Sequence, residues 1–367
     1  MFSDFFRKYI LPTVVLSGGM IGVGFLSLPH VALKAGIWIT MVYFVVLAFV
    51  VLSINIIFAK ISLQTPDFKR FPGFVGYYLG KWGGLTAFIT SILGYLGVLL
   101  VYLIIGGEFL NSALHSVLGG SSVIYTLLYF VLATVVVFFG IKIISRVELL
   151  SVSLLLLSIV LIAIKGFWDI KLGNVFSTPL NEQLSNIFIP YGPILFAMWG
   201  IGIIPEVEEM MRGNKKMISK VITAGTLIPV LIYVLFTILI LSITGSATTE
   251  SALTGLNNPI LLLIGAMVTF VAFIVQALTF KKSLIYDLKI KESHALVISC
   301  FTPLVLFLLG MKSFVPLVSF IGGVLLSIDG VLILLMYKKI GGKKIVILPL
   351  VIIFILGIIY EIAYFIK

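Results

Sequence analysis

Apolar segments of membrane-spanning length follow one another along almost the whole chain, and they restrict its fold more than any other feature. A helix needs about 20 apolar residues to cross the hydrocarbon core of a bilayer. With 61% hydrophobic and only 11% charged residues, the chain has too little polar surface for a soluble domain. We therefore expect an all-α polytopic membrane protein with about eleven transmembrane helices. The predicted spans are 9–34, 37–60, 84–114, 123–141, 148–168, 186–210, 219–244, 259–280, 294–310, 313–337 and 345–366.

The loops between these spans alternate in basic charge. Of the 25 Lys and Arg residues, twenty fall on one side, and the five on the other side are Lys34, Lys165, Lys171, Lys312 and Lys367. The positive-inside rule predicts a multi-pass protein of the cell membrane with a cytoplasmic N-terminus and, after eleven spans, an extracytoplasmic C-terminus. Basic loops that face anionic lipid headgroups account for the net charge of +11, so no nucleic-acid partner is needed.

Two of the spans contain matched glycine motifs. Residues 20–24 read MIGVG and are followed by Pro29, whereas residues 198–202 read MWGIG and are followed by Pro205. Glycine is a poor helix former, and unwound backbone inside a membrane is tolerated only where protein covers it or where it lines a cavity. Matched breaks in two halves of a chain predict a secondary transporter with its substrate between the broken helices.

The positions of the two motifs also predict a symmetry. The first break lies in a span that runs outward, and the second lies five spans later in a span that runs inward. We expect spans one to five (residues 1–168) and six to ten (residues 169–340) to be inverted repeats. Span eleven (residues 341–367) is an addition, and the whole chain forms one integral membrane domain.

The motifs resemble those of the amino acid/auxin permease family, within the amino acid–polyamine–organocation superfamily. The resemblance rests on residues 19–29 (GMIGVGFLSLP) in the first span and on residues 191–207 in the sixth. It implies a LeuT-like fold with 5+5 inverted repeats and broken helices 1 and 6. It also implies uptake of small amino acids or related compounds by alternating access, usually driven by protons or sodium.

The breaks themselves suggest how a substrate is held. Unwinding around Ser17–Gly22 would place a half-helix N-terminus near Val23, which suits a carboxylate, whereas the preceding carbonyls suit an ammonium group. The second break, Ala197–Gly202, would offer the same N–H and carbonyl ends in the opposite direction. A zwitterionic amino acid, with one carboxylate and one ammonium group, matches both kinds of end. In the alternative interpretation the glycines only permit close helix packing, and Trp199 and Tyr95 only pack. The candidate substrate-binding residues are Ser17, Gly18, Gly19, Met20, Ile21, Gly22, Tyr95, Ala197, Met198, Trp199 and Gly200.

Ionisable residues inside spans are candidates for ion coupling because burying them is costly. Asp329 lies in the tenth span, where desolvation favours the neutral acid that a proton carrier requires. A structural hydrogen bond to a neighbouring helix is the alternative role. Glu206 follows Pro205 in the sixth span and either contacts the moving first half-helix or faces cytoplasmic water.

A sodium site is the second possibility for coupling. The resemblance implies carbonyl ligands at Gly18 and Ile21, with hydroxyl ligands on the eighth span. Thr269 matches one of these hydroxyls, but Phe270 replaces the next. Hard cations prefer about six oxygen ligands, so a missing hydroxyl favours protons.

The leading interpretation is thus a proton-coupled importer of small amino acids. The alternatives are a sodium-coupled amino acid symporter and a non-transporting amino acid sensor of the same fold. The expected partners are an amino acid, a proton or sodium ion, and membrane lipid. The chain has no HExxH or GxSxG motif and no clustered metal ligands in sequence. We therefore expect no enzyme, no metal and no cofactor.

Overall fold

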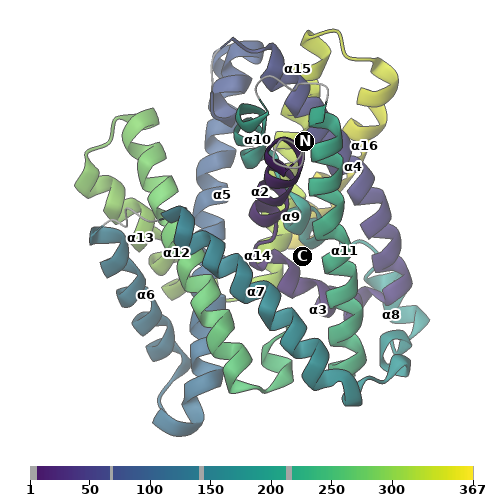
Figure 1. Cartoon of the computed structure of the whole chain (residues 1–367), viewed down its shortest axis with the longest axis vertical. Coiled ribbons are helices and arrows are strands. Elements are labelled where there is room, and N and C mark those ends of the chain that lie inside the picture. Colours follow the sequence, from purple (N-terminus) through teal and green to yellow (C-terminus); the bar gives the residue numbers. More distant parts are fainter. Residues whose placement is uncertain (1–5, 67–68, 140–143, 212–216, 367) are drawn as a thin grey trace.

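The computed structural model describes residues 6–66, 69–139, 144–211 and 217–366, and these residues form helices and connecting turns without any strand (Figure 1). Several basic loop residues, Lys142, Arg212, Lys215, Lys216 and Lys367, lie outside this part. The α-helices are α2 Leu11–Met20, α3 Leu28–Ala35, α4 Ile37–Gln64, α5 Phe71–Leu118, α6 Ser122–Phe139, α7 Ile144–Gly166, α8 Leu180–Ser185, α9 Tyr191–Met198, α10 Ile204–Met210, α11 Ile218–Thr244, α12 Pro259–Leu288, α13 Glu292–Leu308, α14 Phe314–Phe320, α15 Ser327–Lys339 and α16 Lys344–Ile366. Shorter 3-10 and π-helical turns are η1 Phe6–Ile10, η2 Val23–Ser27, η3 Phe167–Asp169, η4 Leu172–Phe176, η5 Ile201–Ile203, η7 Gly245–Ala247, η8 Thr254–Leu256 and η9 Ile321–Leu326.

Each predicted span overlaps one of these helices or a broken pair, so the all-α membrane architecture is confirmed. Seven helical stretches in the described chain are long and apolar enough to cross a membrane, and one bent pair makes an eighth. The other three predicted spans correspond to α7, to the short helices α9 and α10, and to the 17-residue α13. The predicted repeat limits at residues 168 and 340 fall in η3 and just after α15, and they remain predictions.

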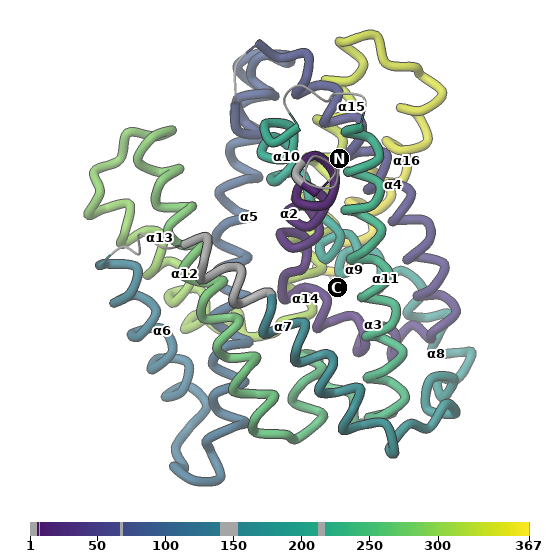
Figure 2. Tube along the Cα trace, in the orientation of Figure 1, coloured from purple at the N-terminus to yellow at the C-terminus, as the bar shows by residue number. Residues whose placement is uncertain are grey.

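The broken helices lie in the middle of the molecule. Figures 1 and 2 show α2, α9 and α14 between α5 on one side and α4 and α11 on the other, with α6, α12 and α13 at one flank. Helix α5 runs through the whole bundle and changes direction at Gly80, whose φ of 77° lies in the left-handed region that glycine tolerates. Together these helices enclose both breaks.

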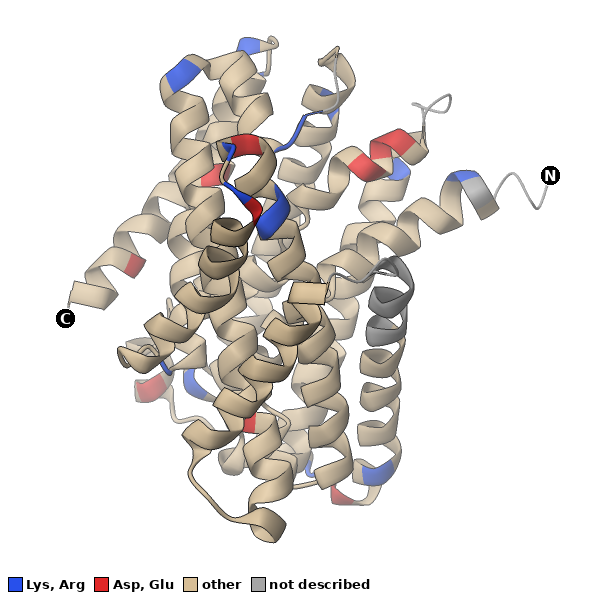
Figure 3. Ribbon diagram, turned by 90° about the vertical axis from the view of Figure 1, so that its left-hand side faces the viewer, with Lys and Arg blue, Asp and Glu red and all other residues tan. Residues whose placement is uncertain are grey.

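Charged side chains gather near the ends of the bundle, and the helical middle is almost free of them (Figure 3). Lys and Arg are most frequent at the end that carries the N-terminus of α2 and helix α10. This distribution is typical of a bilayer-embedded bundle, because an ion in the hydrocarbon core is costly.

Span ten contains a π-helical stretch between two α-helices. Turn η9 joins α14 to α15 and packs against α9, α5 and α16. A π-bulge widens a helix locally and is often found at functional sites. Gly322 of η9 lies directly against the backbone of Gly192 in α9, so that a side chain at residue 322 would collide with the Gly192 carbonyl. Span ten is thereby closely packed onto the first half of span six.

Candidate functional site

The first break separates α2 from η2 and is narrower than the sequence predicts. The unwound residues are Ile21, with ψ of 85°, and Gly22, which is extended with φ of −109° and ψ of −176°. Ser17–Met20 belong to α2, which corrects the prediction of unwinding from Ser17 onward. This last turn persists because Ile21 N–H donates to the Ser17 carbonyl and the Ser17 hydroxyl donates to the Gly225 carbonyl of α11.

The second break has the same form but is also narrower than predicted. Helix α9 continues through Ala197 to Met198, and only Trp199 and Gly200 depart from helical geometry. Trp199 is extended, with φ of −73° and ψ of 121°, and its side chain is half-buried. A 3-10 turn, η5, then leads into α10, where Pro205 occupies the first turn. In both spans a helix, two unwound residues, a 3-10 turn and a proline-led helix follow in this order.

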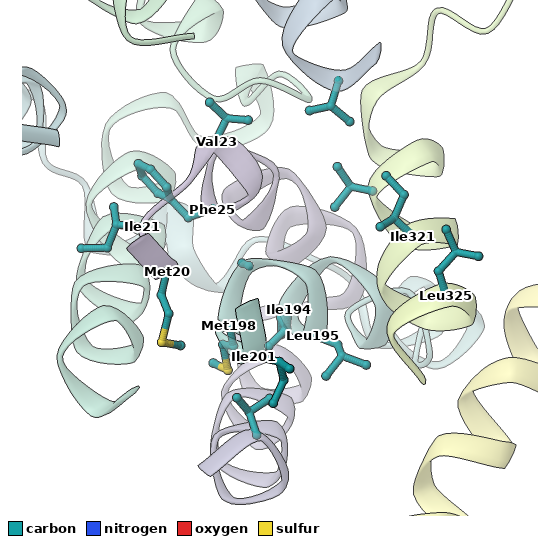
Figure 4. Close-up of a cluster of buried hydrophobic side chains, with 14 of the residues drawn as sticks. Met20, Ile21, Val23, Phe25, Ile194, Leu195, Met198, Ile201, Ile321 and Leu325 are labelled. Carbon is teal, nitrogen blue, oxygen red and sulfur yellow. The ribbon is translucent and has the colours of Figure 1, made fainter. Parts of the chain in front are cut away.

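The two breaks touch each other. A Cβ on Gly24 would lie 2.5 Å from the Phe196 ring, and one on Gly200 would lie 2.9 Å from Met20 Cγ and Sδ. Figure 4 shows apolar side chains from both breaks and from η9 as members of one buried cluster. Glycine at these two positions permits the close approach of the two half-helices.

A tyrosine hydroxyl joins the two breaks, and sequence reasoning missed it. Tyr233 of α11 is fully buried, and its hydroxyl lies 2.8 Å from the Met20 carbonyl and 3.0 Å from the Ala197 carbonyl. These carbonyls belong to the last turns of α2 and α9, where the helix dipole is negative. The sequence suggested the carbonyl groups at these helix ends as partners for a cation or an ammonium group. In the structure the Tyr233 hydroxyl is their common hydrogen-bond donor. The residue is separated from its partners by 213 and 36 positions, so no local motif reveals it.

A cavity of about 140 Å³ opens on the first break. Its lining combines backbone of the first break with apolar side chains of α7 and α12. A built Cβ on Gly22 would lie 3.8 Å from the Tyr102 hydroxyl, and one on Gly18 would meet open space. The first N–H groups of η2, at Val23 and Gly24, have no partner within the turn. The lining residues are Gly18, Gly19, Ile21, Gly22, Val23, Tyr102, Leu155, Val268, Val271, Ala272, Val275 and Gln276.

The cavity contains only part of the predicted substrate-binding set. Gly18, Gly19, Ile21 and Gly22 line it, whereas Ser17 and Met20 point into helix contacts. The residues of the second break, Ala197, Met198, Trp199 and Gly200, do not line it.

Tyr95 also lies outside the cavity, because its ring stacks on Phe280 with the ring centroids 5.2 Å apart. Tyr102, which does line the cavity, follows Tyr95 by seven residues. Two turns of α-helix return a side chain to nearly the same face, about 10 Å further along the axis. Tyr95 and Tyr102 thus share one face of α5 at two levels, and only Tyr102 lines this cavity. Gln276 was missed as well, although an amide inside the apolar run of α12 was a readable signal.

The candidate sodium ligands are divided between two neighbouring cavities. Gly18 and Ile21 line the larger one, whereas Thr269 lines an adjacent small one of about 10 Å³. The Thr269 hydroxyl donates to the Ala266 carbonyl at 2.9 Å within its own helix. Val23, Leu155 and Val268 line both cavities, so the first break reaches each of them.

The predicted proton carriers lie away from these cavities. Asp329 of α15 is buried, and Thr90 of α5 donates a hydrogen bond of 2.6 Å to its carboxylate. Glu206 is exposed in the first turn of α10. No group of three His, Cys, Asp or Glu side chains in the described part of the chain is arranged to hold a metal ion.

Comparisons with known proteins place the chain among permeases. A family model described as the tryptophan/tyrosine permease family matches residues 7–252. Over 231 residues the chain is 22% identical to the "Tyrosine-specific transport system 1" of Haemophilus influenzae, a region that covers 63% of this chain and 56% of that relative. The match therefore spans little more than half the length of the relative. The family and this relative are both named for transport, in agreement with the expectation that the chain is not an enzyme.

The whole chain also shares its fold with a solved structure. MhsT in complex with L-phenylalanine superposes with a TM-score of 0.58 and 13% identity, over 96% of this chain and 97% of that chain. The predicted LeuT-like fold is thereby confirmed, whereas the resemblance to amino acid/auxin permeases in particular is not. Since the family model covers more than half of its length, the chain belongs to the tryptophan/tyrosine permease family.

Proposed function

We propose that this protein is a secondary transporter that imports an amino acid by alternating access. The observation that carries the proposal is the cavity at the first break, which is lined both by backbone at the start of η2 and by apolar side chains. The N-terminus of a helical turn suits a carboxylate, and Gln276 and the Tyr102 hydroxyl supply further polar contacts. An amino acid matches this combination of polar and apolar lining.

We further propose that the substrate side chain is apolar or aromatic. The apolar lining residues include Leu155, Val268, Val271 and Val275, whose side chains are hydrocarbon. A cavity of about 150 Å³ in another protein accommodates benzene, so the space of about 140 Å³ suits a ring or a branched chain. The names of the family and the curated relative, and the L-phenylalanine in MhsT, support this proposal. The small amino acids expected from the sequence are the competing class.

Transport is proposed to be driven by protons, with the N-terminus in the cytoplasm and the C-terminus outside. The clustering of basic side chains at the end that carries α2 and α10 supports this orientation. The missing hydroxyl at Phe270 supports protons over sodium. Asp329 is the carrier that the sequence suggests, although its carboxylate already accepts a hydrogen bond from Thr90.

The test is uptake of radiolabelled amino acids into proteoliposomes that contain the purified protein. We expect counterflow of tyrosine, tryptophan or phenylalanine without any gradient, and accumulation when the interior is made alkaline in sodium-free buffer. Preference for glycine and alanine would contradict the aromatic proposal, and dependence on sodium alone would contradict proton coupling. Thermal stabilisation by an amino acid without counterflow would show a sensor instead of a transporter.

A further inference from the structure

A second buried carboxyl group lies outside the central cavity, on the last helix. The side chain of Glu361 in α16 is only 1% exposed. Its Oε1 atom is buried without a hydrogen-bond partner, and neither of the two ion pairs found in the described chain includes it. Burying an ionised carboxylate without a counter-ion is strongly unfavourable. Sequence reasoning selected Asp329 and did not consider this residue.

Glu361 lines a pocket of about 300 Å³ that shares no lining residue with the cavity at the first break. Lys34 and Tyr364 are exposed at its margin, whereas Glu361 is its most deeply buried ionisable residue. The pocket thus gives a buried carboxyl group a polar connection to the surface. The lining residues are His30, Lys34, Asn186, Ile189, Glu250, Val315, Pro316, Ser319, Tyr360, Glu361 and Tyr364.

Two glycines form a tight cradle around the Glu361 side chain. A Cβ on Gly192, in the first turn of α9, would lie 2.7 Å from Glu361 Oε1, and one on Gly323 of η9 would collide with the Glu361 methylene group. A third glycine, Gly357, lies one turn earlier on α16 and packs against the ring of Tyr191. The carboxyl group therefore lies where α9, η9 and α16 meet.

Ionisable and charged groups approach Glu361 from several elements, but none forms an ion pair with it. The Glu250 carboxylate lies 3.2 and 3.3 Å from the N–H groups of Phe314 and Val315, and the His30 ring contacts the Thr248 carbonyl at 3.3 Å. On α9, the Tyr191 hydroxyl is hydrogen-bonded to the Ser327 hydroxyl of α15. The groups that face Glu361 or line its pocket are His30 and Lys34 of α3, Tyr43 of α4, Tyr191 of α9, Glu250 of the loop before α12, and Tyr360 and Tyr364 of α16.

We propose that Glu361 is a proton-binding residue whose protonation controls the packing of α9 against η9. An O–H bond forms on the Glu361 carboxylate with a proton from water in the pocket, and the same proton returns to water when that bond breaks. The neutral acid fits the glycine cradle, where an anion would be left without a counter-ion. This inference rests on the proton-coupled transport proposed above and names the residue that binds the proton.

The geometry links this residue to the substrate site through one short helix. Helix α9 begins beside Glu361 and ends at the second break, which touches the first break through Gly200 and Met20. Eight residues of α-helix span about 12 Å. Ionised Glu361 would have to leave the cradle towards the pocket, and α9 would lose its close contact with η9. Proton release would thus displace the half-helix whose end packs against the first break.

The test compares Glu361→Gln with a matched control, Glu108→Gln. Glutamine keeps the shape of the neutral acid but cannot exchange a proton. Glu108 is a half-buried carboxyl group on α5 that accepts hydrogen bonds from Ser251 and Thr254, so the same substitution leaves the cradle intact. We expect Glu361→Gln to retain amino acid counterflow while the ratio of uptake with and without a pH gradient falls to unity. Glu108→Gln should keep the gradient dependence of the unaltered protein.

A spectroscopic measurement separates failure of this inference from failure of the proposed function. Infrared spectra of the unaltered protein in lipid should show the carbonyl stretch of a buried protonated carboxyl group, and Glu361→Gln should lack one such band. Loss of gradient dependence in Asp329→Asn, with Glu361→Gln unaffected and no band lost, would overturn the inference. If uptake by the unaltered protein ignores protons, the proposed coupling fails, and the infrared band alone decides whether Glu361 binds a proton.

Discussion

The two helix breaks have nearly the same local structure but opposite surroundings. Each consists of two unwound residues, a 3-10 turn and a proline-led helix. At the first break, built side-chain positions on Gly18 and Gly22 face open space or the Tyr102 hydroxyl. At the second, the built position on Gly200 is blocked by Met20. The first break lines the cavity, and the unwound residues of the second break do not.

This difference indicates that the two breaks have different functions although their glycine motifs are alike in sequence. Unwound backbone in a membrane must be covered by protein or line a cavity. The first break lines a cavity, and Gly200 of the second is covered by Met20. We infer that the first break binds the substrate and the second packs behind it. The matched motifs predict a substrate site between both breaks, and the cavity is lined by the first break.

The comparison is tested most severely by adding a side chain at each break. Gly22→Leu should fill the cavity beside Tyr102 and weaken amino acid binding by more than about tenfold, or about 1.4 kcal/mol. Gly200→Ala should instead lower the melting temperature and preserve affinity, because its Cβ presses on the flexible Met20 side chain and not on substrate. Ligand-induced thermal shifts and binding isotherms measure both effects.

The control is Gly94→Leu, because a side chain at this half-buried position of α5 meets open space outside the cavity. It should change neither affinity nor uptake. Unaltered affinity in Gly22→Leu, or lost affinity in Gly200→Ala at full stability, would reverse the roles assigned to the two breaks.

The sequence was sufficient for the spans and the breaks, but not for the contacts across them. Apolar run length and the glycine–proline spacing are local signals, and both breaks appear within the predicted stretches. How far the helix unwinds depends on distant partners, such as the Gly225 carbonyl that accepts from Ser17. Which tyrosine of α5 reaches the cavity depends on the level at which α5 passes the break. Neither quantity is encoded in a local motif.

Tyr233 offers an intermediate test, because its hydroxyl lies within hydrogen-bond distance of a carbonyl at each break. Tyr233→Phe removes a hydroxyl from two buried carbonyls, at Met20 and Ala197. Leaving a buried acceptor unsatisfied costs about 1–3 kcal/mol. We expect a lower free energy of unfolding and slower counterflow, since the half-helices no longer move together. Denaturation in detergent and counterflow rates measure these two effects.

Tyr95→Phe is the matched control for this substitution. The Tyr95 ring stacks on Phe280 and lies outside the cavity. Removing its hydroxyl should therefore change stability and transport less than Tyr233→Phe does. If both tyrosine variants behave alike, the Tyr233 hydroxyl makes no specific contribution to stability or transport. The two breaks are then not coupled through this side chain.

The smallest expected effect concerns the second cavity that the first break reaches. Thr269→Val replaces the hydroxyl in the cavity of about 10 Å³ by a methyl group of similar shape. The lost hydrogen bond runs to the Ala266 carbonyl of the same helix, so the free energy of unfolding should change by less than about 1 kcal/mol. Under the proton proposal, uptake driven by a pH gradient should remain unchanged, because the hydroxyl holds no ion. If sodium were bound beside the first break, the variant would lose a ligand and sodium would no longer stabilise it. Uptake and thermal shifts measured with and without sodium distinguish these outcomes. A sodium effect that disappears in Thr269→Val would mean that the first break binds both substrate and ion.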